Sequence, residues 1–144
     1  MYEKYFIDGD VKPEFRTEYI SLWPHWLGKE NLHLLDKVTE FEWKRFNSFI
    51  EAVSNKFKVG LIDISEEAVN FPSTITSTFS DFHDSQNKDA SLFSKYVLPE
   101  LGCLITEEFD FTYILWHRNN GALEALKPLI IAAELQHFSD RRYG

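Results

Sequence analysis

Residues 81–84 place two carboxylates beside an imidazole, in the order Asp81-Phe-His83-Asp84. Carboxylates next to a histidine could ligate a divalent metal or tune a general base. However, Asp, Asn and Ser are residues that loops favour, and this spacing matches no established pattern of metal ligands. We therefore predict a solvated loop at these positions, with no bound metal.

His117-Arg118, at the end of a predicted strand, is a second candidate site. An imidazole titrates near neutral pH and could serve as a general base. A small hydrolase or nuclease with a scattered site would use this histidine together with Asp81, His83 and Asp84. A polar exit from a sheet explains the same pair, and this is the interpretation that we favour.

The sequence carries none of the short motifs that identify common enzymes. Its six glycines are scattered and form neither a dinucleotide-binding fingerprint nor a P-loop. It also has no nucleophile elbow, zinc-protease helix or EF-hand loop. The single cysteine, Cys103, lies within a predicted strand and is expected to act as a small buried hydrophobe. We therefore favour a protein without catalytic residues and without a cofactor.

Acidic residues next to aromatic ones form the remaining pattern. They gather in two segments that are predicted to lie in or beside turns. A rim of acids around aromatic anchors suits docking onto a basic protein, whereas a solvated turn would explain either segment alone. The predicted partner-binding residues are Glu66, Glu67, Glu107, Glu108, Phe109 and Asp110.

The composition provides material for a core and an acidic surface. Aromatic residues make up 16% of the 144 residues, and the formal net charge is −8. Such a charge repels phosphate backbones, so we expect no nucleic-acid binding. It would steer a basic partner toward the protein, although acidity also serves solubility alone.

Nothing in the sequence predicts a membrane or secretory segment. The first residues lack the basic stretch and apolar run of a signal peptide. The most apolar runs, Phe111–Trp116 and Pro128–Ala133, are far shorter than the ~20 residues needed to cross a bilayer. We expect a cytoplasmic protein that does not bind membranes.

The best-specified element is a helix over residues 39–57. Thr39 and Glu42 have the spacing of a capping box. Apolar residues then recur at steps of three and four, which places them on one helical stripe, and Phe41 and Phe49 widen it. The stripe consists of Trp43, Phe46, Ile50, Val53 and Phe57.

Shorter segments flank this helix. Residues 59–64 predict a strand, and residues 90–98 predict a short helix. Residues 73–82 fit either a strand or an irregular helix. The first 36 residues predict irregular structure, apart from a turn at Asp8-Gly9 between two short apolar runs.

The clearest sheet signal is an antiparallel hairpin. Gly102–Thr106 and Phe109–His117 flank Glu107-Glu108, which we predict to be its turn. Both faces of the second strand are largely apolar, so it should lie centrally, covered on both sides. A helix interrupted by Pro128 and an edge strand at residues 136–138 are expected to follow.

This order of elements predicts the α+β class. Residues 1–144 form one domain, with a largely antiparallel sheet, a central hairpin and about three helices packed against it. A doubly wound parallel fold is not expected, because the strongest strands are hairpin neighbours.

The segment Leu104–Phe138 is similar in style to the immunity proteins of polymorphic and contact-dependent bacterial toxin systems. The residues responsible are Leu104-Ile-Thr-Glu-Glu-Phe-Asp-Phe-Thr-Tyr-Ile-Leu-Trp and Gly121-Ala-Leu-Glu-Ala-Leu-Lys-Pro-Leu-Ile. The shared features are small size, acidity, many aromatic residues and no catalytic motif, so no functional residue is carried over. The resemblance implies a tight inhibitor of one cognate toxin, often a basic nuclease.

Three functions are therefore compatible with the sequence. The first is an immunity protein that neutralises a basic toxin by direct binding. The second is the small hydrolase or nuclease described above. The third is a ligand-sensing or scaffold domain with a pocket lined by Trp23, Trp26 and Trp43. We favour the first.

Overall fold

Short strands and helices follow one another along the computed structural model, which describes residues 1–139. The strands are β1 (Phe6–Ile7), β2 (Asp10–Val11), β3 (Arg16–Ser21), β4 (Gly60–Asp63), β5 (Ala68–Asn70), β6 (Lys95–Leu98), β7 (Cys103–Glu108), β8 (Thr112–His117) and β9 (Gln136–Phe138). The α-helices are α1 (Glu40–Lys56), α2 (Phe82–Asn87) and α3 (Asn120–Ala132). Short 3-10 helices span Tyr2–Lys4, Lys29–Lys37, Ile75–Thr78 and Ala90–Leu92.

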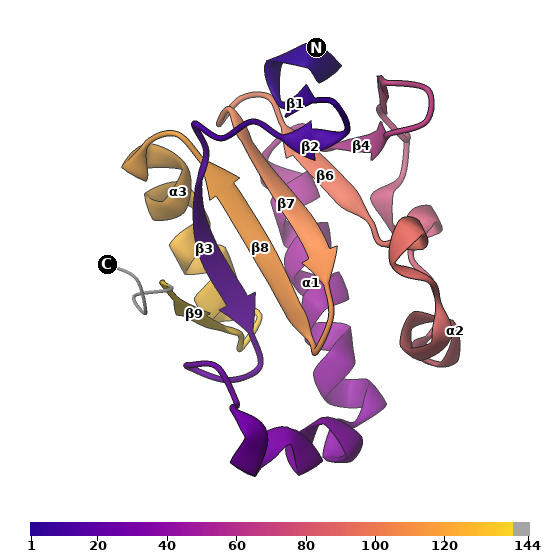
Figure 1. The fold of residues 1–144 in the computed structure, drawn as a ribbon, viewed down its shortest axis with the longest axis vertical. Helices are drawn as coiled ribbons and strands as arrows, with labels where there is room; N and C mark the ends of the chain where they lie inside the picture. Colours follow the sequence, from indigo (N-terminus) through magenta and orange to yellow (C-terminus); the bar gives the residue numbers. More distant parts are fainter. Residues whose placement is uncertain (140–144) are drawn as a thin grey trace.

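One antiparallel sheet organises these elements. Its strand order is β5-β4-β6-β7-β8-β3-β9, and β1 and β2 form a separate hairpin. Helices α1 and α3 lie behind the sheet, and the β1–β2 hairpin lies in front of its upper end (Figure 1). The predicted α+β class is therefore confirmed.

The predicted hairpin is formed by β7 and β8, in the middle of the sheet. Glu108 pairs with Thr112, so the turn consists of Phe109–Phe111. The prediction that Glu107-Glu108 forms the turn is therefore wrong, since both residues belong to β7. The turn lies later because it needs two left-handed residues, and Asp110 is a type that tolerates this conformation.

Two strands of the sheet differ from the sequence predictions. Lys95–Leu98, predicted as helix, forms β6 because β4 and β7 pair with it on either side. Only Ala90–Leu92 is helical there, as a 3-10 turn. Arg16–Ser21, predicted as irregular, forms β3 between β8 and β9. Pairing with neighbouring strands outweighs the weak local preferences of both segments.

Helix α1 covers the rear face of the sheet and confirms the predicted capping box. The Thr39 hydroxyl accepts a hydrogen bond from the Glu42 N–H at 3.1 Å, and the Glu42 carboxylate accepts one from the Thr39 N–H at 3.1 Å. Phe49 joins the core beside the predicted stripe, whereas Phe41 is 75% exposed. The buried residues of α1 are Trp43, Phe46, Phe49, Ile50 and Val53.

Helix α3 packs beside α1 on the same face. The Asn119 side chain caps it by accepting a hydrogen bond from the Gly121 N–H at 2.9 Å. The helix runs through Pro128 to Ala132, so the predicted interruption does not end it. Leu126 and Ile130 bury their side chains against the sheet.

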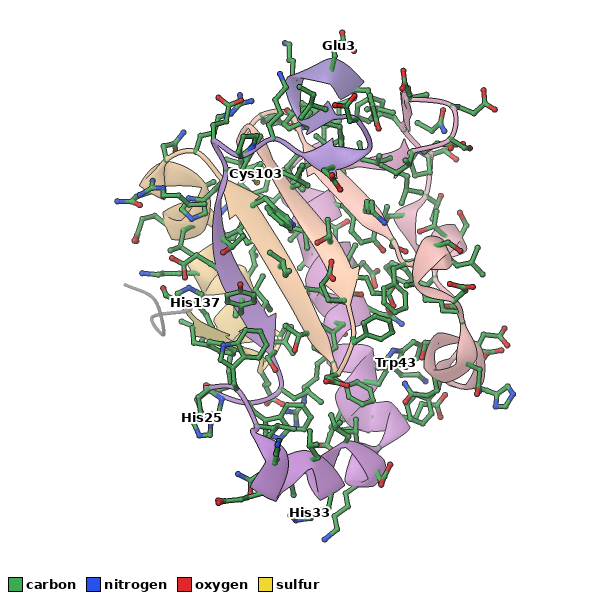
Figure 2. The ribbon with its side chains drawn as sticks, viewed as in Figure 1. Glu3, His25, His33, Trp43, Cys103 and His137 are labelled. Carbon is green, nitrogen blue, oxygen red and sulfur yellow. The ribbon has the colours of Figure 1, made fainter. Side chains whose placement is uncertain are left out.

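The opposite face of the sheet, which we call the open face, is covered only in part. At its upper end, Val97 and Leu104 pack against the aromatic N-terminal segment, which includes Tyr5 and Phe6. Toward the β7–β8 turn, Ile114 and Tyr19 of this face line a cavity. Figures 1 and 2 view the molecule from this side, and Figure 2 shows Cys103 in the upper half and Trp43 in the lower half.

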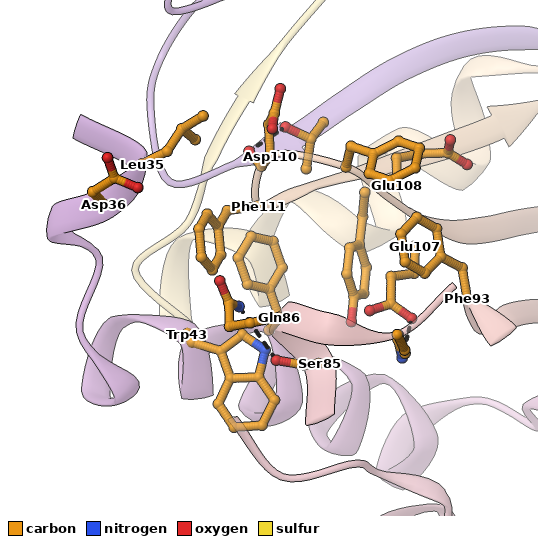
Figure 3. Close-up of a pocket in the computed structure, with 15 residues that line it drawn as sticks. Leu35, Asp36, Trp43, Ser85, Gln86, Phe93, Glu107, Glu108, Asp110 and Phe111 are labelled. Atoms are coloured by element: carbon orange, nitrogen blue, oxygen red, sulfur yellow. Dashed lines mark hydrogen bonds and ion pairs between the residues drawn. The ribbon is translucent and has the colours of Figure 1, made fainter. Parts of the chain in front are cut away.

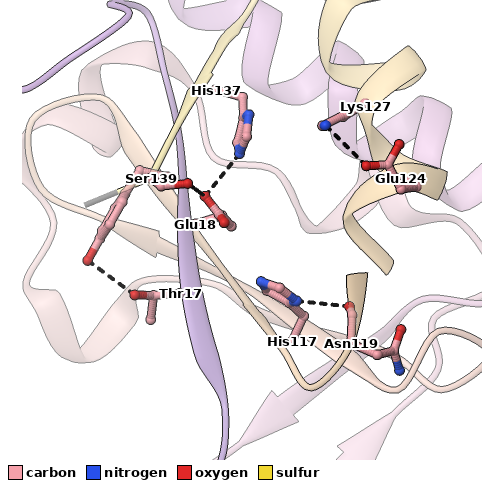
Figure 4. Close-up of polar contacts among 9 residues, drawn as sticks. Thr17, Glu18, His117, Asn119, Glu124, Lys127, His137 and Ser139 are labelled. Atoms are coloured by element: carbon pink, nitrogen blue, oxygen red, sulfur yellow. Dashed lines mark hydrogen bonds and ion pairs between the residues drawn. The ribbon is translucent and has the colours of Figure 1, made fainter. Parts of the chain in front are cut away.

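Strand β9 closes one edge of the sheet, as predicted from the sequence. His137 lies opposite Ile20 of β3. Its imidazole Nε2 lies 3.1 Å from the carboxylate of Glu18, and the Ser139 hydroxyl donates to the same carboxylate (Figure 4). These contacts fix Phe138 on the open face beside Tyr19.

Membrane-spanning helices were sought among residues 1–139. Within this part of the chain, no helix is both long enough and apolar enough to cross a bilayer.

Candidate functional site

The β7–β8 turn has an unusual backbone. Asp110 and Phe111 both adopt the left-handed conformation, with φ angles of 61° and 53°. This conformation is rare for an aromatic residue and costs free energy. The Phe111 ring packs edge-on against Trp23, with ring centroids 6.4 Å apart. The turn thereby buries part of Phe111 and leaves Phe109 64% exposed.

A wide cavity of about 520 Å³ lies on the open face beside this turn. Its size falls within the ~300–1,000 Å³ range of ligand pockets. Strands β3, β8 and β9 and the segment from residue 23 to residue 32 contribute its walls. Its aromatic and aliphatic lining includes Tyr19, Trp23, Trp26, Phe109, Ile114 and Phe138.

A narrow cavity of about 230 Å³ lies on the other side of the turn, between α1, α2 and the hairpin (Figure 3). Trp43, Phe46 and Tyr113 line its apolar part. Burial raises the pKa of the Tyr113 hydroxyl well above its ordinary value of 10.0, so this group stays protonated. Gln86 and Asp36 contribute polar groups.

The turn is shared by the two cavities. Glu108, Phe109, Asp110 and Thr112 line both of them. We call the turn and the two cavities together the hairpin-tip surface. Trp26 is also exposed at this surface. Contiguous apolar exposure of this kind marks interaction sites more often than isolated exposed side chains do.

Glu107 and Glu108 are neighbours with different surroundings. The Glu107 carboxylate lies 2.7 Å from the Lys88 ammonium, and the two side chains are 14% and 13% exposed. It also accepts a hydrogen bond from the Ser94 N–H at 2.8 Å. Glu107 is therefore committed to an internal ion pair.

Glu108 points to the open face instead. Its carboxylate accepts a hydrogen bond from the Thr106 hydroxyl at 3.0 Å, and the Trp116 indole N–H donates to the same hydroxyl at 2.9 Å. Partial burial raises the pKa of Glu108, against the opposing influence of the Thr106 hydrogen bond and then of Lys95. Among the ion pairs of residues 1–139, none joins the Lys95 ammonium to the Glu108 carboxylate.

The other predicted acidic pair lies elsewhere. Glu66 and Glu67 belong to the turn between β4 and β5, at the upper right of the molecule (Figure 1). Both are exposed. The structure therefore divides the predicted partner-binding residues into two groups, of which Glu107, Glu108, Phe109 and Asp110 belong to the hairpin-tip surface.

The residues of the alternative enzymatic site are not brought together. The Asp81 carboxylate caps α2 by accepting a hydrogen bond from the Asp84 N–H at 2.8 Å, and His83 is exposed on this helix. His117 ends β8, whose arrow points away from α2 (Figure 1). Among the described residues, no group of three or more His, Cys, Asp or Glu side chains could hold a metal ion.

His117 and Cys103 are both buried near the upper end of the sheet. His117 is 2% exposed, and its Nδ1 lies 2.9 Å from the carbonyl oxygen of Asn119 (Figure 4). Burial raises the pKa of the Cys103 thiol to about 12, so it stays protonated at neutral pH. This environment fits the small buried hydrophobe expected from the sequence.

Two residues of the wide cavity were missed by sequence reasoning. Tyr19 and Phe138 stack with ring centroids 5.5 Å apart, and they meet only because β3 pairs with β9. The tryptophans of the proposed ligand pocket are also separated. Trp23 and Trp26 line the wide cavity, whereas Trp43 lines the narrow one.

Comparisons with protein-family models, with curated proteins and with solved structures found no match to this chain.

Proposed function

We propose that this chain is a non-catalytic binding protein that neutralises a basic toxin by docking through the hairpin-tip surface, as an immunity protein of a bacterial cytoplasm would. The observation that carries the proposal is the exposure of Phe109, 64% of which faces solvent between two cavities. Its burial in an interface would be favourable, because apolar surface leaves water.

Neighbouring side chains support a protein partner. Phe93 contacts the Phe109 ring edge-on, with centroids 4.9 Å apart. Leu92, next to it in sequence, is exposed, as are Trp26 and Leu32. Interfaces bury such aromatic and aliphatic groups at their centre and keep a polar rim around them.

The charge of the chain supports a basic partner. The formal net charge is −8, and Glu108 and Asp110 place carboxylates beside Phe109. Electrostatic attraction would speed the encounter with a basic protein, and the apolar groups would slow dissociation. A basic nuclease is the toxin class that the sequence resemblance favours.

The first experiment clones the genes that flank the gene for this chain and uses any basic toxin domain that they encode. Growth of cells that express the domain is measured with and without the chain, and calorimetry measures the Kd of the purified pair. We expect restored growth and a one-to-one complex. A toxin domain that is neither bound nor neutralised would contradict the proposal.

A pair of variants then locates the interface. Phe109→Ala should weaken binding by about 2 kcal/mol, or about 30-fold in Kd, mainly through faster dissociation. Ile7→Ala is the control, because Ile7 is also exposed but lies on β1, at the opposite end of the sheet. Equal effects of the two substitutions would place the interface elsewhere.

Charge reversal tests whether the carboxylates of this surface attract a basic partner electrostatically. Glu108→Lys with Asp110→Lys should slow association in stopped-flow experiments, with a smaller effect on dissociation. The control is Glu66→Lys with Glu67→Lys, which changes the net charge equally at the opposite end. Glu107 is left unchanged because its reversal would break the ion pair with Lys88.

A further inference from the structure

Three aromatic rings in the lining of the wide cavity pack against one another. Tyr19 and Phe138 are nearly parallel, with an interplanar angle of 22°. Trp26 stands across both of them, with ring centroids 4.7 Å from Tyr19 and 5.2 Å from Phe138. The faces of such rings carry negative electrostatic potential and attract cations.

The polar part of the same lining includes two acidic residues beside Ser21, His25 and Thr112. Glu108 and Asp110 contribute carboxylates to the wide cavity, and no lysine or arginine occurs among its described lining residues. Glu108 is partly removed from water, and this desolvation raises its pKa. A bound cation would relieve that cost by supplying an opposite charge.

The chain already holds one arginine by this combination of groups. The Arg118 guanidinium lies 4.3 Å from the centroid of the Phe15 ring. One of its nitrogens is 3.2 Å from the Glu14 carboxylate. The same nitrogen also donates a hydrogen bond to the Lys4 carbonyl oxygen. An aromatic face and a carboxylate are therefore among the groups that position a guanidinium in this fold.

We infer that the wide cavity binds an arginine side chain, presented by an exposed loop of the basic partner. Arginine fits better than lysine because its planar guanidinium stacks on aromatic rings and donates two parallel hydrogen bonds to a carboxylate. The lysine ammonium is more strongly hydrated and has no flat face. This inference specifies the partner chemistry of the proposed function and rests on it.

The test titrates three capped tripeptides, acetyl-Gly-X-Gly-amide, in which X is arginine, lysine or citrulline. Citrulline keeps the shape of arginine but is uncharged. NMR follows the indole N–H signals of the four tryptophans. The arginine peptide should shift Trp23 and Trp26 in the wide cavity and leave Trp43, which lines the narrow one, in place. Lysine should bind about tenfold more weakly, and citrulline should not bind measurably.

Variants assign the contacts. Glu108→Gln and Tyr19→Leu should each weaken the arginine peptide about tenfold, whereas Glu66→Gln should have no effect. An unchanged Trp43 signal shows that a variant is folded, because Trp43 packs against Phe82 and lines the other cavity. Equal binding of the three peptides, or no shift of Trp23 and Trp26 with the arginine peptide, would overturn the inference.

The outcomes separate this inference from the proposed function. If a toxin binds through Phe109 but none of the peptides binds, the docking surface is supported and the arginine site is contradicted. If the arginine peptide binds selectively but the chain does not protect cells from the toxin, the arginine site is supported and the neutralising function is contradicted.

Discussion

The two faces of the sheet are formed by the same strands but differ in how completely the rest of the chain covers them. On the face toward α1 and α3, alternate strand residues such as Ile105 and Leu115 have no exposed surface. On the open face, their neighbours Thr106 and Trp116 are hydrogen-bonded to each other, and Ile114 lines a cavity. One face is therefore filled by the chain itself, and the lower part of the other keeps polar and aromatic groups accessible.

This difference explains why aromatic content alone did not reveal an interface. The rings of Phe46 and Tyr113 meet at 4.8 Å beneath the sheet, where they contribute to the core. Those of Trp26 and Phe109 are exposed beside the cavities. Aromatic residues therefore contribute to stability on one face and are available for binding on the other.

The largest expected effect tests the covered face. Phe46 is 2% exposed, so Phe46→Ala should lower the free energy of unfolding by about 3–5 kcal/mol through lost burial and a residual cavity. Phe41→Ala on the same helix is the control, because this ring is already in water and its removal should cost less than about 0.5 kcal/mol. Urea denaturation measures both. Similar values for the two variants would contradict the assignment of the faces.

The sequence predicted what local patterns encode. The capping box of Thr39 and Glu42, the Asp8-Gly9 turn and the β7–β8 hairpin depend on neighbouring residues, and all three are present. Strands β3 and β6 depend on pairing with distant partners. No local signal reveals such pairing, so one was predicted as irregular and the other as helix.

The residues of the candidate site were likewise predicted only where they are neighbours in the sequence. Phe109 and the neighbouring acids were identified because they adjoin one another in the sequence. The cluster of Tyr19, Trp26 and Phe138 joins β3 with the distant β9, so it required the fold. Glu107 and Glu108 looked equivalent in sequence, and only their opposite strand faces separate an internal ion pair from an accessible carboxylate.

A smaller effect is expected at Thr106, which is buried on the open face. Thr106→Val removes the acceptor of the Trp116 indole N–H and the donor to Glu108, and should destabilise the fold by about 2 kcal/mol. Thr106→Ser keeps the hydroxyl and should cost less than about 1 kcal/mol. Thermal and urea unfolding give the values. A valine variant as stable as the wild type would mean that these hydrogen bonds contribute nothing to folding.

The smallest expected change in the free energy of unfolding is an increase, and it concerns Glu108. Burial raises the pKa of this carboxyl above its ordinary value of 4.5, so the folded state holds its proton more tightly than the unfolded state. The contribution of Glu108 to stability therefore falls as the pH rises from its pKa in the unfolded state through its higher pKa in the folded state. At neutral pH the ionised carboxylate opposes folding. Glu108→Gln removes that cost.

We therefore expect Glu108→Gln to raise the free energy of unfolding at pH 7, by less than about 1 kcal/mol because the group is partly solvated. The gain should vanish below about pH 4, where the carboxyl is protonated in both states. Urea denaturation at the two pH values, with Glu66→Gln as an exposed control, measures it. A variant that gains stability while losing the arginine peptide would show that Glu108 is kept for binding at the expense of folding. Destabilisation at pH 7 would instead make Glu108 part of the structural framework, like its neighbour Glu107.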